Sequence, residues 1–573
     1  MKRKTKIKEE WLTHFEKSGM LESPDYETTI NYFNKFELES PYVKIQHLAF
    51  TPEGRELKVV VVSKDKTFIP VEAKKTKKTI VLIQNGIHPG EIEGKDASML
   101  LLRDILITKE KEHLLDNLIL LIIPVLNADG HERLSPYNRP NQNGPKQMGW
   151  RTNSLNLNLN RDYAKADSPE TKGFLKLFDD WIPDFMIDNH STNGADYQYH
   201  VTYGIETHQN IDEGLSNWIK TKYLPHLIEN VEMDGFLTAP YIEFKNGNIE
   251  SGIKNWFAPP RLSHGYCATQ NRICLLVETH SLKPFENRVF STISMMTHTL
   301  EYINSNHIEL TTLNRGADKE THNKYLKNKR QFPIVLAGTD ISEPFQFKAF
   351  KWKDEHSEIT GSKVRYYTNE PIDIEIPLYD DVEVLNFVRV PFAYLVPKQF
   401  ASIIELLKMH HIKFFKRRNE STTLAETYRF KNVSFYPFPY EGRQLIKFKV
   451  ESFVDDFVIP PGTILVPANQ RQLRLIVNLL EPEAPDSLVN WGFFNAFFER
   501  KEYAESYVME PYAKKMLAEN PKLKEEFIKK LESDEEFRNN SSERLDYFYR
   551  RSPFYDTGEN VYPILRIFKP LGN

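Results

Sequence analysis

The sequence predicts an α/β fold in its first half, joined to a second region rich in strands. Between residues 42 and 305, short apolar runs alternate with segments of helical spacing. That alternation is typical of a largely parallel or mixed sheet covered by helices on both faces. The chain also has 573 residues, which is too many for one hydrophobic core. We therefore expect more than one domain.

Five apolar runs have the length of buried strands, at residues 57–63, 79–84, 118–126, 185–190 and 273–278. They are rich in β-branched residues or leucine and are bounded by residues that break regular structure. Helical spacing occupies four further segments, at residues 92–106, 169–181, 211–228 and 285–303. Together these elements predict one α/β domain.

Three parts are expected along the chain. Residues 1–40 predict short amphipathic helices, and residues 41–310 hold the α/β domain. A polar stretch at residues 311–329 breaks the alternation, so we place the boundary near residue 310. Residues 311–573 contain further strands, a turn at Pro460-Pro461-Gly462 and a return of helical spacing from residue 470. They predict an α+β region whose function the sequence does not indicate.

Composition and charge exclude several classes of protein. The net charge of −4 arises from 75 basic and 79 acidic residues, so nucleic-acid binding has no electrostatic support. Cys267 and Cys274 are too few for a disulfide framework or a multi-cysteine zinc site. No apolar run reaches the roughly 20 residues of a membrane-spanning helix, and the N-terminus has no apolar signal core.

The first candidate site follows the strand expected at residues 79–84. There the segment NGIHPGE, residues 85–91, leads into a helix, and ligands of open α/β sheets bind beyond the carboxyl ends of strands. His88 and Glu91 are three residues apart, so a turn entering a helix can aim both side chains at one point. Imidazole and carboxylate groups are suitable zinc ligands.

The spacing alone is weak evidence, because the chain repeats it twice. His226 and Glu229 are also three residues apart, as are His298 and Glu301. Both of these pairs fall inside helical patterns, where an i,i+3 pair on the helix surface is the better interpretation. Only the strand-turn-helix setting distinguishes the first pair.

His190 ends the apolar strand at residues 185–190 and precedes small polar residues. If this strand neighbours the first one, His190 points into the same crevice as His88 and Glu91. Two histidines and one glutamate form an open zinc site that keeps a position for water. The alternative is a loop histidine bonded to the backbone.

Glu278 ends the apolar strand at residues 273–278. A carboxylate there is costly to bury without a partner or a task. Next to zinc it could take a proton from zinc-activated water as a general base. The alternative is an ion pair at the strand end with a nearby arginine, for instance Arg272 or Arg288.

Six motifs, in this order, resemble the zinc carboxypeptidase family typified by pancreatic carboxypeptidases A and B. Within residues 45–305 they are HPGE at 88–91, NADG at 127–130, Trp150-Arg151, Asn160-Arg161, His190-Ser191 and the strand-end Glu278. The resemblance implies that family's three-layer α/β/α fold with a central mixed sheet. The stretch from Arg261 to Arg288 also looks like a branch of uncharacterised bacterial relatives, which carry long C-terminal extensions.

The resemblance also implies the chemistry. His88, Glu91 and His190 would hold one zinc ion per chain, and Glu278 would be the general base. The expected reaction is hydrolysis of C-terminal peptide bonds by zinc-activated water. Relatives of this type are often exported, so a periplasmic or extracellular location, with the signal absent from this chain, is favoured over the cytoplasm. Nothing in the sequence indicates the oligomeric state.

On the substrate side, the resemblance implies roles for three further residues. Arg151 would stabilise the oxyanion, because its charge is permanent and its donors are preorganised. Asn160 and Arg161 would grip a free carboxylate on a peptide or acyl-amino-acid substrate, since a planar guanidinium can bind two oxygens.

This chain departs from the family pattern in two places. Asn158 stands where the family usually has an aspartate that supports the first zinc histidine. The substrate-binding tyrosine of the family is not matched in place; Tyr266 is the nearest substitute and Tyr241 is another.

Two other functions remain open. The same scaffold could serve a deacylase or an amidase that trims cell-wall peptides, because similar zinc sites perform those reactions. The chain could also be a catalytically silent peptide-binding protein. The complete set of His88, Glu91, His190, Arg151 and Glu278 argues against that last alternative.

Overall fold

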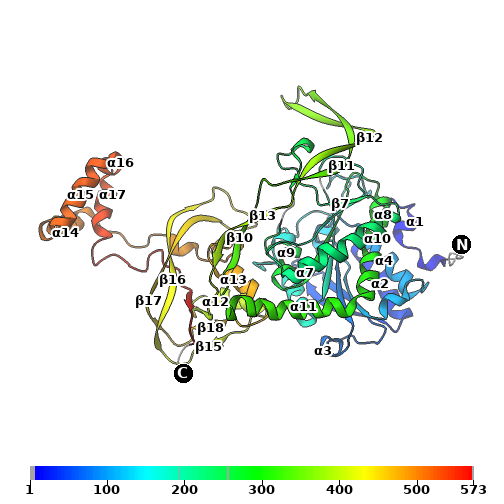
Figure 1. Cartoon of the computed structure of the whole chain (residues 1–573), viewed down its shortest axis with the longest axis horizontal. Coiled ribbons are helices and arrows are strands. Elements are labelled where there is room, and N and C mark those ends of the chain that lie inside the picture. Colours follow the sequence, from blue (N-terminus) through cyan, green and yellow to red (C-terminus); the bar gives the residue numbers. More distant parts are fainter. Residues whose placement is uncertain (1–6, 193, 255–256, 571–573) are drawn as a thin grey trace.

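The computed structural model describes residues 7–192, 194–254 and 257–570. An α/β domain lies at the end that carries the N-terminus, strand-rich structure follows it, and a small group of helices lies at the opposite end (Figure 1). The N-terminal part consists of three short helices, η1 (Glu9–Trp11), α1 (His14–Lys17) and α2 (Tyr26–Glu39).

The α/β domain is built around an eight-stranded sheet. In spatial order its strands are β1 (Val43–Phe50), β2 (Glu56–Val62), β4 (Leu118–Ile123), β3 (Thr79–Gln84), β5 (Phe185–Ser191), β9 (Ile273–Thr279), β6 (Val201–Gly204) and β7 (Thr238–Pro240). The four central strands β4, β3, β5 and β9 run parallel. β1, β2 and β6 pair antiparallel with neighbours, so the sheet is mixed as predicted.

Helices cover both faces of this sheet. The helices of this domain are α3 (Pro70–Ala73), α4 (Glu93–Leu106), η2 (Glu112–Leu115), α5 (Ala128–Glu132), η3 (Leu159–Arg161), α6 (Pro169–Trp181), α7 (Glu213–Trp218), η4 (Ile219–Tyr223), α8 (Leu224–Met233), η5 (Ile249–Ser251), α9 (Ser263–Thr269) and α10 (Phe285–Ser305). Every residue of β3, β4, β5 and β9 is buried, as strands covered on both faces must be.

The side chains of β5 show which helices lie on which face. Met186 contacts Cys267 of α9, whereas Asn189 contacts Met296 of α10. Successive strand residues point to opposite faces, so α9 and α10 lie on opposite sides of the sheet. The predicted three-layer α/β/α architecture is confirmed.

The predicted elements agree with the structure except near one boundary. The five strands and four helical segments are all present, although residues 211–228 divide into α7, η4 and α8. The polar stretch at residues 311–329 was expected to interrupt the pattern, but α11 (His307–His322) and η6 (Asn323–Lys327) occupy most of it. Asn314 is buried and donates to the backbone oxygen of Asp184, so this polar helix crosses residue 310 and packs on the α/β domain.

The C-terminal region is α+β, as predicted. Its strands are β10 (Phe332–Gly338), β11 (Glu343–His356), β12 (Lys363–Tyr379), β13 (Val382–Val388), β14 (Ala393–Val396), β15 (Phe415–Lys416), β16 (Ser421–Phe435), β17 (Ile446–Ile459), β18 (Ile464–Pro467) and β19 (Leu565–Ile567). Its helices are α12 (Ala401–Met409), α13 (Leu473–Leu480), η7 (Asn495–Phe498), α14 (Ser506–Glu519), α15 (Pro521–Ser533), α16 (Glu535–Asn539) and α17 (Ser541–Tyr549).

This region contains two long hairpins. The first, β11–β12, extends a small sheet with β8 (Ile253–Lys254) of the first half. The second, β16–β17, forms the edge of a six-stranded sheet in the order β15-β18-β14-β19-β16-β17. α12 contacts α6, and α13 contacts α9 and α11, so the C-terminal region packs directly on one helix layer of the α/β domain.

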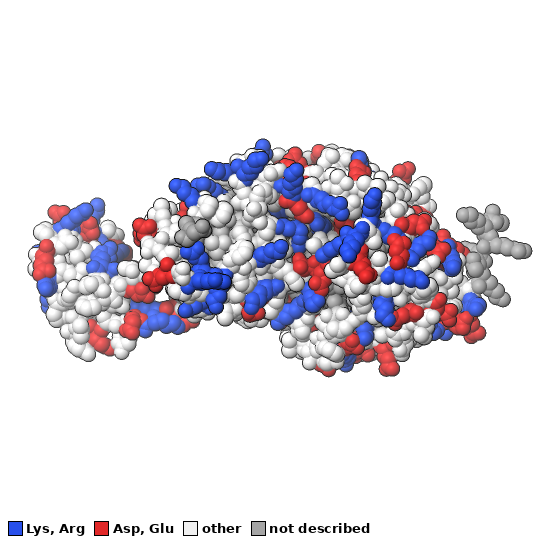
Figure 2. All heavy atoms as spheres, turned by 90° about the horizontal axis from the view of Figure 1, so that it is seen from below, with Lys and Arg blue, Asp and Glu red and all other residues white. Residues whose placement is uncertain are grey.

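Charged side chains of both signs occur along the whole face drawn in Figure 2. Positive and negative side chains are therefore mixed on that face. Among the residues that the structure describes, no helix is both long and apolar enough to cross a membrane.

Candidate metal centre

The first two residues of the centre lie in the loop between β3 and α4. Gly86 takes a left-handed φ of +64°, and an added Cβ there would lie 3.0 Å from Cγ1 of Val125. Glycine suits this turn because it adopts that conformation without steric cost. His88 and Glu91 follow and are both buried, with Nδ1 of His88 3.0 Å from Oε2 of Glu91.

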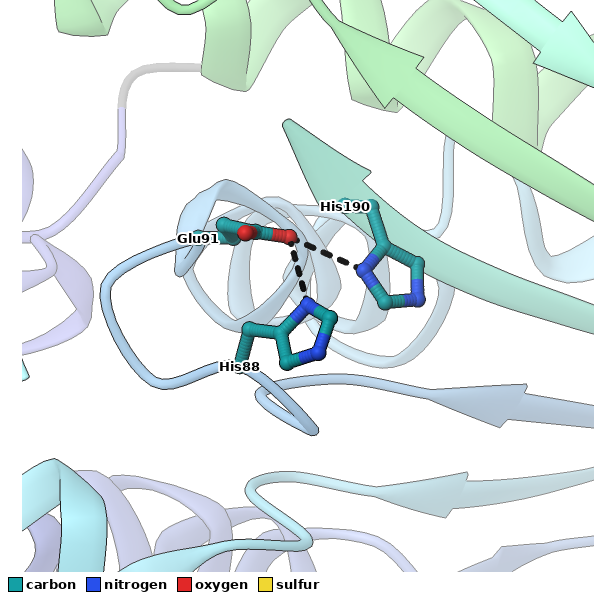
Figure 3. Close-up of side chains that lie close together, drawn as sticks. All are labelled: His88, Glu91 and His190. Carbon is teal, nitrogen blue, oxygen red and sulfur yellow. Dashed lines mark hydrogen bonds and ion pairs between the residues drawn. The ribbon is translucent and has the colours of Figure 1, made fainter. Parts of the chain in front are cut away.

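His190 reaches the same point from the neighbouring strand. Because β3 and β5 pair in parallel, the last residues of β5 and the loop that follows β3 meet at one edge of the sheet. Nδ1 of His190 lies 2.9 Å from the same Oε2 of Glu91. Figure 3 shows both imidazoles pointing at that carboxylate. One potential ligand atom from each residue lies within 4.8 Å of the others, so the three predicted ligands are brought together.

The outer nitrogen of each imidazole also has an oxygen partner. Nε2 of His88 lies 2.9 Å from Oδ1 of Asn158, and Nε2 of His190 lies 3.0 Å from Oδ2 of Asp188. Such partners orient a ligating histidine and leave its other nitrogen for the metal. Two histidines, one carboxylate and these outer oxygens are a donor set that suits zinc.

Charges and burial shift the pKa values of the cluster in different directions. Burial lowers the pKa of His88 to about 4, although Glu91 opposes this shift. Burial also acts to lower the pKa of His190, but Asp188 and Glu91 outweigh it and raise that pKa well above its usual range. For Glu91, burial is outweighed by His88, Arg139 and His190, so its pKa falls well below the usual value. The site therefore favours an ionised Glu91, which is the form that binds metals.

Two arginines bind the other oxygen of the same carboxylate. Arg139 and Arg151 each place a guanidinium nitrogen 3.0 Å from Oε1 of Glu91. Arg139 is buried, whereas the side chain of Arg151 is 37% exposed. Arg151 therefore lies beside the cluster, with part of its side chain accessible from solution.

Glu278 is the last residue but one of β9 and is in register with His190 of β5. Residues in register on neighbouring strands point to the same face, so both side chains lie on the side of α9. Burial raises the pKa of Glu278 to about 8; the charge of His190 opposes the shift, and Glu91 adds to it. A buried carboxyl group with a raised pKa beside a set of potential metal ligands is typical of a catalytic acid or base.

The two arginines proposed as alternative partners of Glu278 are used elsewhere. Arg272 pairs with Asp318 at 3.1 Å, and Arg288 pairs with the buried Glu93. The interpretation of Glu278 as half of an ion pair with either arginine is therefore wrong.

Asn160 and Arg161 lie in η3, the short helix that begins directly after Asn158. Oδ1 of Asn160 accepts from the backbone N–H of Ser263 at 3.2 Å. Arg161 donates from Nη1 to the backbone oxygen of Asn160 at 2.6 Å and from Nε to the hydroxyl of Tyr440 at 3.1 Å. The guanidinium of Arg161 is thus held from both sides.

The structure does not bring Tyr266 to the cluster. Tyr266 is a residue of α9, and its ring points into the core. The ring centres of Tyr163 and Phe178 are each 5.7 Å from it. Tyr241 is close instead: burial raises the pKa of its hydroxyl, and the charges of Glu278 and Glu91 add to the shift. Tyr266 faces the core because it lies on the inner side of a short helix packed on β5 and β9.

Residues 29–221 match the model of a family described as zinc carboxypeptidase. The chain carries a zinc carboxypeptidase domain. Carboxypeptidase 2 of Trichophyton rubrum is 22% identical over 483 residues, which cover 81% of this chain and 83% of that protein. A protein of Saccharomyces cerevisiae that is named an inactive metallocarboxypeptidase is 35% identical over 136 residues, which cover 22% of this chain and 30% of that protein.

Among solved structures, carboxypeptidase A from Helicoverpa armigera aligns with a TM-score of 0.36 at 15% identity, over 52% of this chain and 74% of that chain. A metallo-carboxypeptidase from Burkholderia cenocepacia aligns with a TM-score of 0.36 at 17% identity, over 49% and 69% of the two chains. Scores this low transfer no detail of the site to the present domain.

Sequence reasoning missed two residues of the carboxypeptidase domain. Asp188 had a usable signal: it precedes His190 by two residues on one strand, so both side chains share a face. Arg139 had none, because it is a single arginine in a long loop whose path the sequence does not specify.

Proposed function

We propose that the chain is a zinc-dependent metallocarboxypeptidase, in which His88, Glu91 and His190 hold one zinc ion. The observation that carries the proposal is the convergence of two imidazole Nδ1 atoms on one oxygen of Glu91, beside the buried Glu278. A bound zinc ion supplies positive charge, which lowers the pKa of water and of nearby carboxyl groups and polarises a carbonyl group.

Glu278 is the proposed general base. Its carboxylate accepts a proton from the attacking water and then delivers it to the nitrogen of the leaving amine. Its place at the end of β9, in register with His190, supports this role. Tyr241, which is near Glu278, is the proposed tyrosine of the substrate site in place of Tyr266.

The arginines divide the work of holding the substrate. Arg151 lies beside the cluster and stabilises the negative charge that develops on the carbonyl oxygen. Arg161, held by Asn160 and Tyr440, binds the free carboxylate at the substrate's C-terminus. This carboxylate clamp, Asn160 and Arg161, restricts cleavage to the last peptide bond.

The decisive experiment compares peptides that differ only in a free or an amidated C-terminus. Charge-assisted hydrogen bonds contribute about 1.5–3 kcal/mol each, so kcat/KM for the amidated peptide is expected to be at least about tenfold lower. Arg161→Ala removes most of this discrimination, because neither substrate then meets the clamp. Arg151→Ala slows both substrates alike, since the oxyanion forms in each.

Equal cleavage of the two peptides by the unmodified protein would exclude the exopeptidase and leave the amidase or deacylase. Bound zinc without turnover of either peptide would favour the silent peptide-binding protein.

A further inference from the structure

The tip of the β16–β17 hairpin, residues 436–445, reaches the segment that carries the carboxylate clamp. The hydroxyl of Tyr440 accepts a hydrogen bond from Nε of Arg161 at 3.1 Å. The carboxylate of Glu441 accepts one from the backbone N–H of Asn158 at 2.9 Å. More than 270 residues of chain separate each pair, so the C-terminal region contributes directly to the surroundings of the site.

A third contact anchors the same tip. Arg443 binds Asp167 through two hydrogen bonds, of 2.5 and 3.1 Å, and both side chains are only about a quarter exposed. Arg–carboxylate pairs of this bidentate kind have a well-defined geometry. The tip therefore contacts the segment 158–167 on both sides of Arg161.

The backbone of the tip is a tight turn. Tyr440 and Arg443 exchange two backbone hydrogen bonds, of 2.8 and 3.0 Å. The two residues between them, Glu441 and Gly442, have left-handed φ values of +49° and +73°. Left-handed values at both central positions define the type I′ turn, whose twist matches the flanking strands of a hairpin. The three contacting side chains thus project from one ordered turn.

The ring of Tyr440 is also held from behind. It stacks on the buried Trp491, with ring centres 6.0 Å apart and planes at 15°. The guanidinium of Arg261 lies 5.0 Å from the Trp491 ring and pairs with Asp486 at 2.7 Å. The position of the Tyr440 hydroxyl is consequently determined by packing against Trp491 of the C-terminal region and Arg261 of the α/β domain.

We propose that Tyr440 is a positioning residue for the clamp, so that the C-terminal region completes the substrate site. The proposal rests on the proposed function, in which Arg161 binds the substrate carboxylate. A flexible arginine loses side-chain entropy when it binds. Holding Nε on Tyr440 and Nη1 on the backbone of Asn160 orients the remaining N–H groups before substrate arrives. Such preorganisation strengthens binding by lowering its entropic cost.

The test is Tyr440→Phe, which removes the hydroxyl and keeps the ring on Trp491. For a peptide with a free C-terminus, KM is expected to rise about three- to tenfold while kcat stays within about twofold, as loss of uniform binding predicts. Cleavage of the amidated peptide is expected to be unchanged. Tyr436→Phe is the matched control, because Tyr436 lies on the same tip with its ring against Lys447.

A double-mutant cycle with Arg161→Ala isolates the coupling. In the Arg161→Ala protein, Tyr440→Phe should have no further effect on either peptide. Arg443→Ala, which releases the tip from Asp167, should shift KM in the same direction and provides a second variant if the first fails to fold.

The outcomes separate the two hypotheses. If Arg161→Ala loses the discrimination between free and amidated peptides but Tyr440→Phe keeps all of it, the positioning role is wrong and the proposed function stands. An equal loss of kcat on both peptides in Tyr440→Phe would also overturn it, because that indicates a merely structural effect. If the unmodified protein does not discriminate, the carboxypeptidase assignment fails, and the positioning role fails with it.

Discussion

His88 and Glu91, at the end of β3, have the same sequence spacing as His298 and Glu301 within α10. In the first pair, Nδ1 and Oε2 are 3.0 Å apart and both side chains are less than 5% exposed. In the second pair the corresponding atoms are 3.4 Å apart, and the side chain of Glu301 is 40% exposed. Spacing alone thus produces a local contact in both places.

The third partner distinguishes the two pairs. At the sheet edge, His190 arrives from a neighbouring strand and shares one oxygen of Glu91 with His88. On α10, Nε2 of His298 instead meets the half-exposed carboxylate of Asp234 at 2.8 Å. A helix surface offers neighbours three or four residues away, whereas the edge of a parallel sheet collects residues from distant segments.

The largest expected effect is on metal binding. His190→Ala removes one of three ligands and should abolish stoichiometric zinc, whereas His298→Ala should leave it intact. Metal analysis of the two purified variants checks this. One tightly bound zinc in His190→Ala would show that the sheet-edge cluster is not the metal site.

The next effect concerns chemistry at the same edge. Glu278→Gln keeps size and hydrogen bonding but removes the base, so kcat should fall by at least about 100-fold while zinc stays bound. Glu301→Gln, on the helix pair, should turn over normally. Steady-state kinetics on proteins with equal zinc contents measures both effects. If kcat of Glu278→Gln were close to that of the parent, the role of Glu278 would be refuted.

A smaller effect is expected one contact further out. Asp188 orients His190 as Asp234 orients His298, so the two aspartates form a matched pair. Asp188→Asn should weaken zinc affinity about 10- to 100-fold, measured by competition with a chelator. Asp234→Asn should leave the affinity unchanged. Equal zinc affinities in both variants would mean that the contact between Asp188 and His190 does not affect metal binding.

The smallest effect is the pH-dependent stability that the helix pair contributes. The hydrogen bond with Glu301 raises the pKa of His298 above its ordinary 6.5; burial opposes the shift, and Asp234 adds to it. A raised folded-state pKa stabilises the protein below pH 6.5, and the gain is lost as pH rises through the folded value. At pH 5.5 the free energy of unfolding of the parent should therefore exceed that of His298→Gln by at most about 1 kcal/mol. At pH 9 this difference should be smaller. Thermal melts of both proteins at the two pH values measure it. If the difference in stability became larger as the pH rises, the raised pKa of His298 would be contradicted.

Local pattern was sufficient to predict the strands β2, β3, β4, β5 and β9 of the eight-stranded sheet, but not β1, β6 and β7. The apolar runs predicted β3 and α6 at their observed bounds and β5 and β9 to within one residue, because each is a contiguous stretch with a clear hydrophobic period. The sequence also placed His190 and Glu278 at strand ends and His88 and Glu91 in the turn that follows a strand. The polar helix α11 escaped prediction because its stability comes from buried contacts such as that of Asn314 with Asp184.

The sequence by itself located the carboxyl ends of β3, β5 and β9 to within one residue, because each of these buried strands contains an apolar run. Only the tertiary structure decided which of these ends meet. It turned Tyr266 into the core and brought Tyr241 to Glu278. It also brought Tyr440 to Arg161 from 279 residues away. Such contacts depend on how whole layers pack, and no local period in the chain encodes that packing.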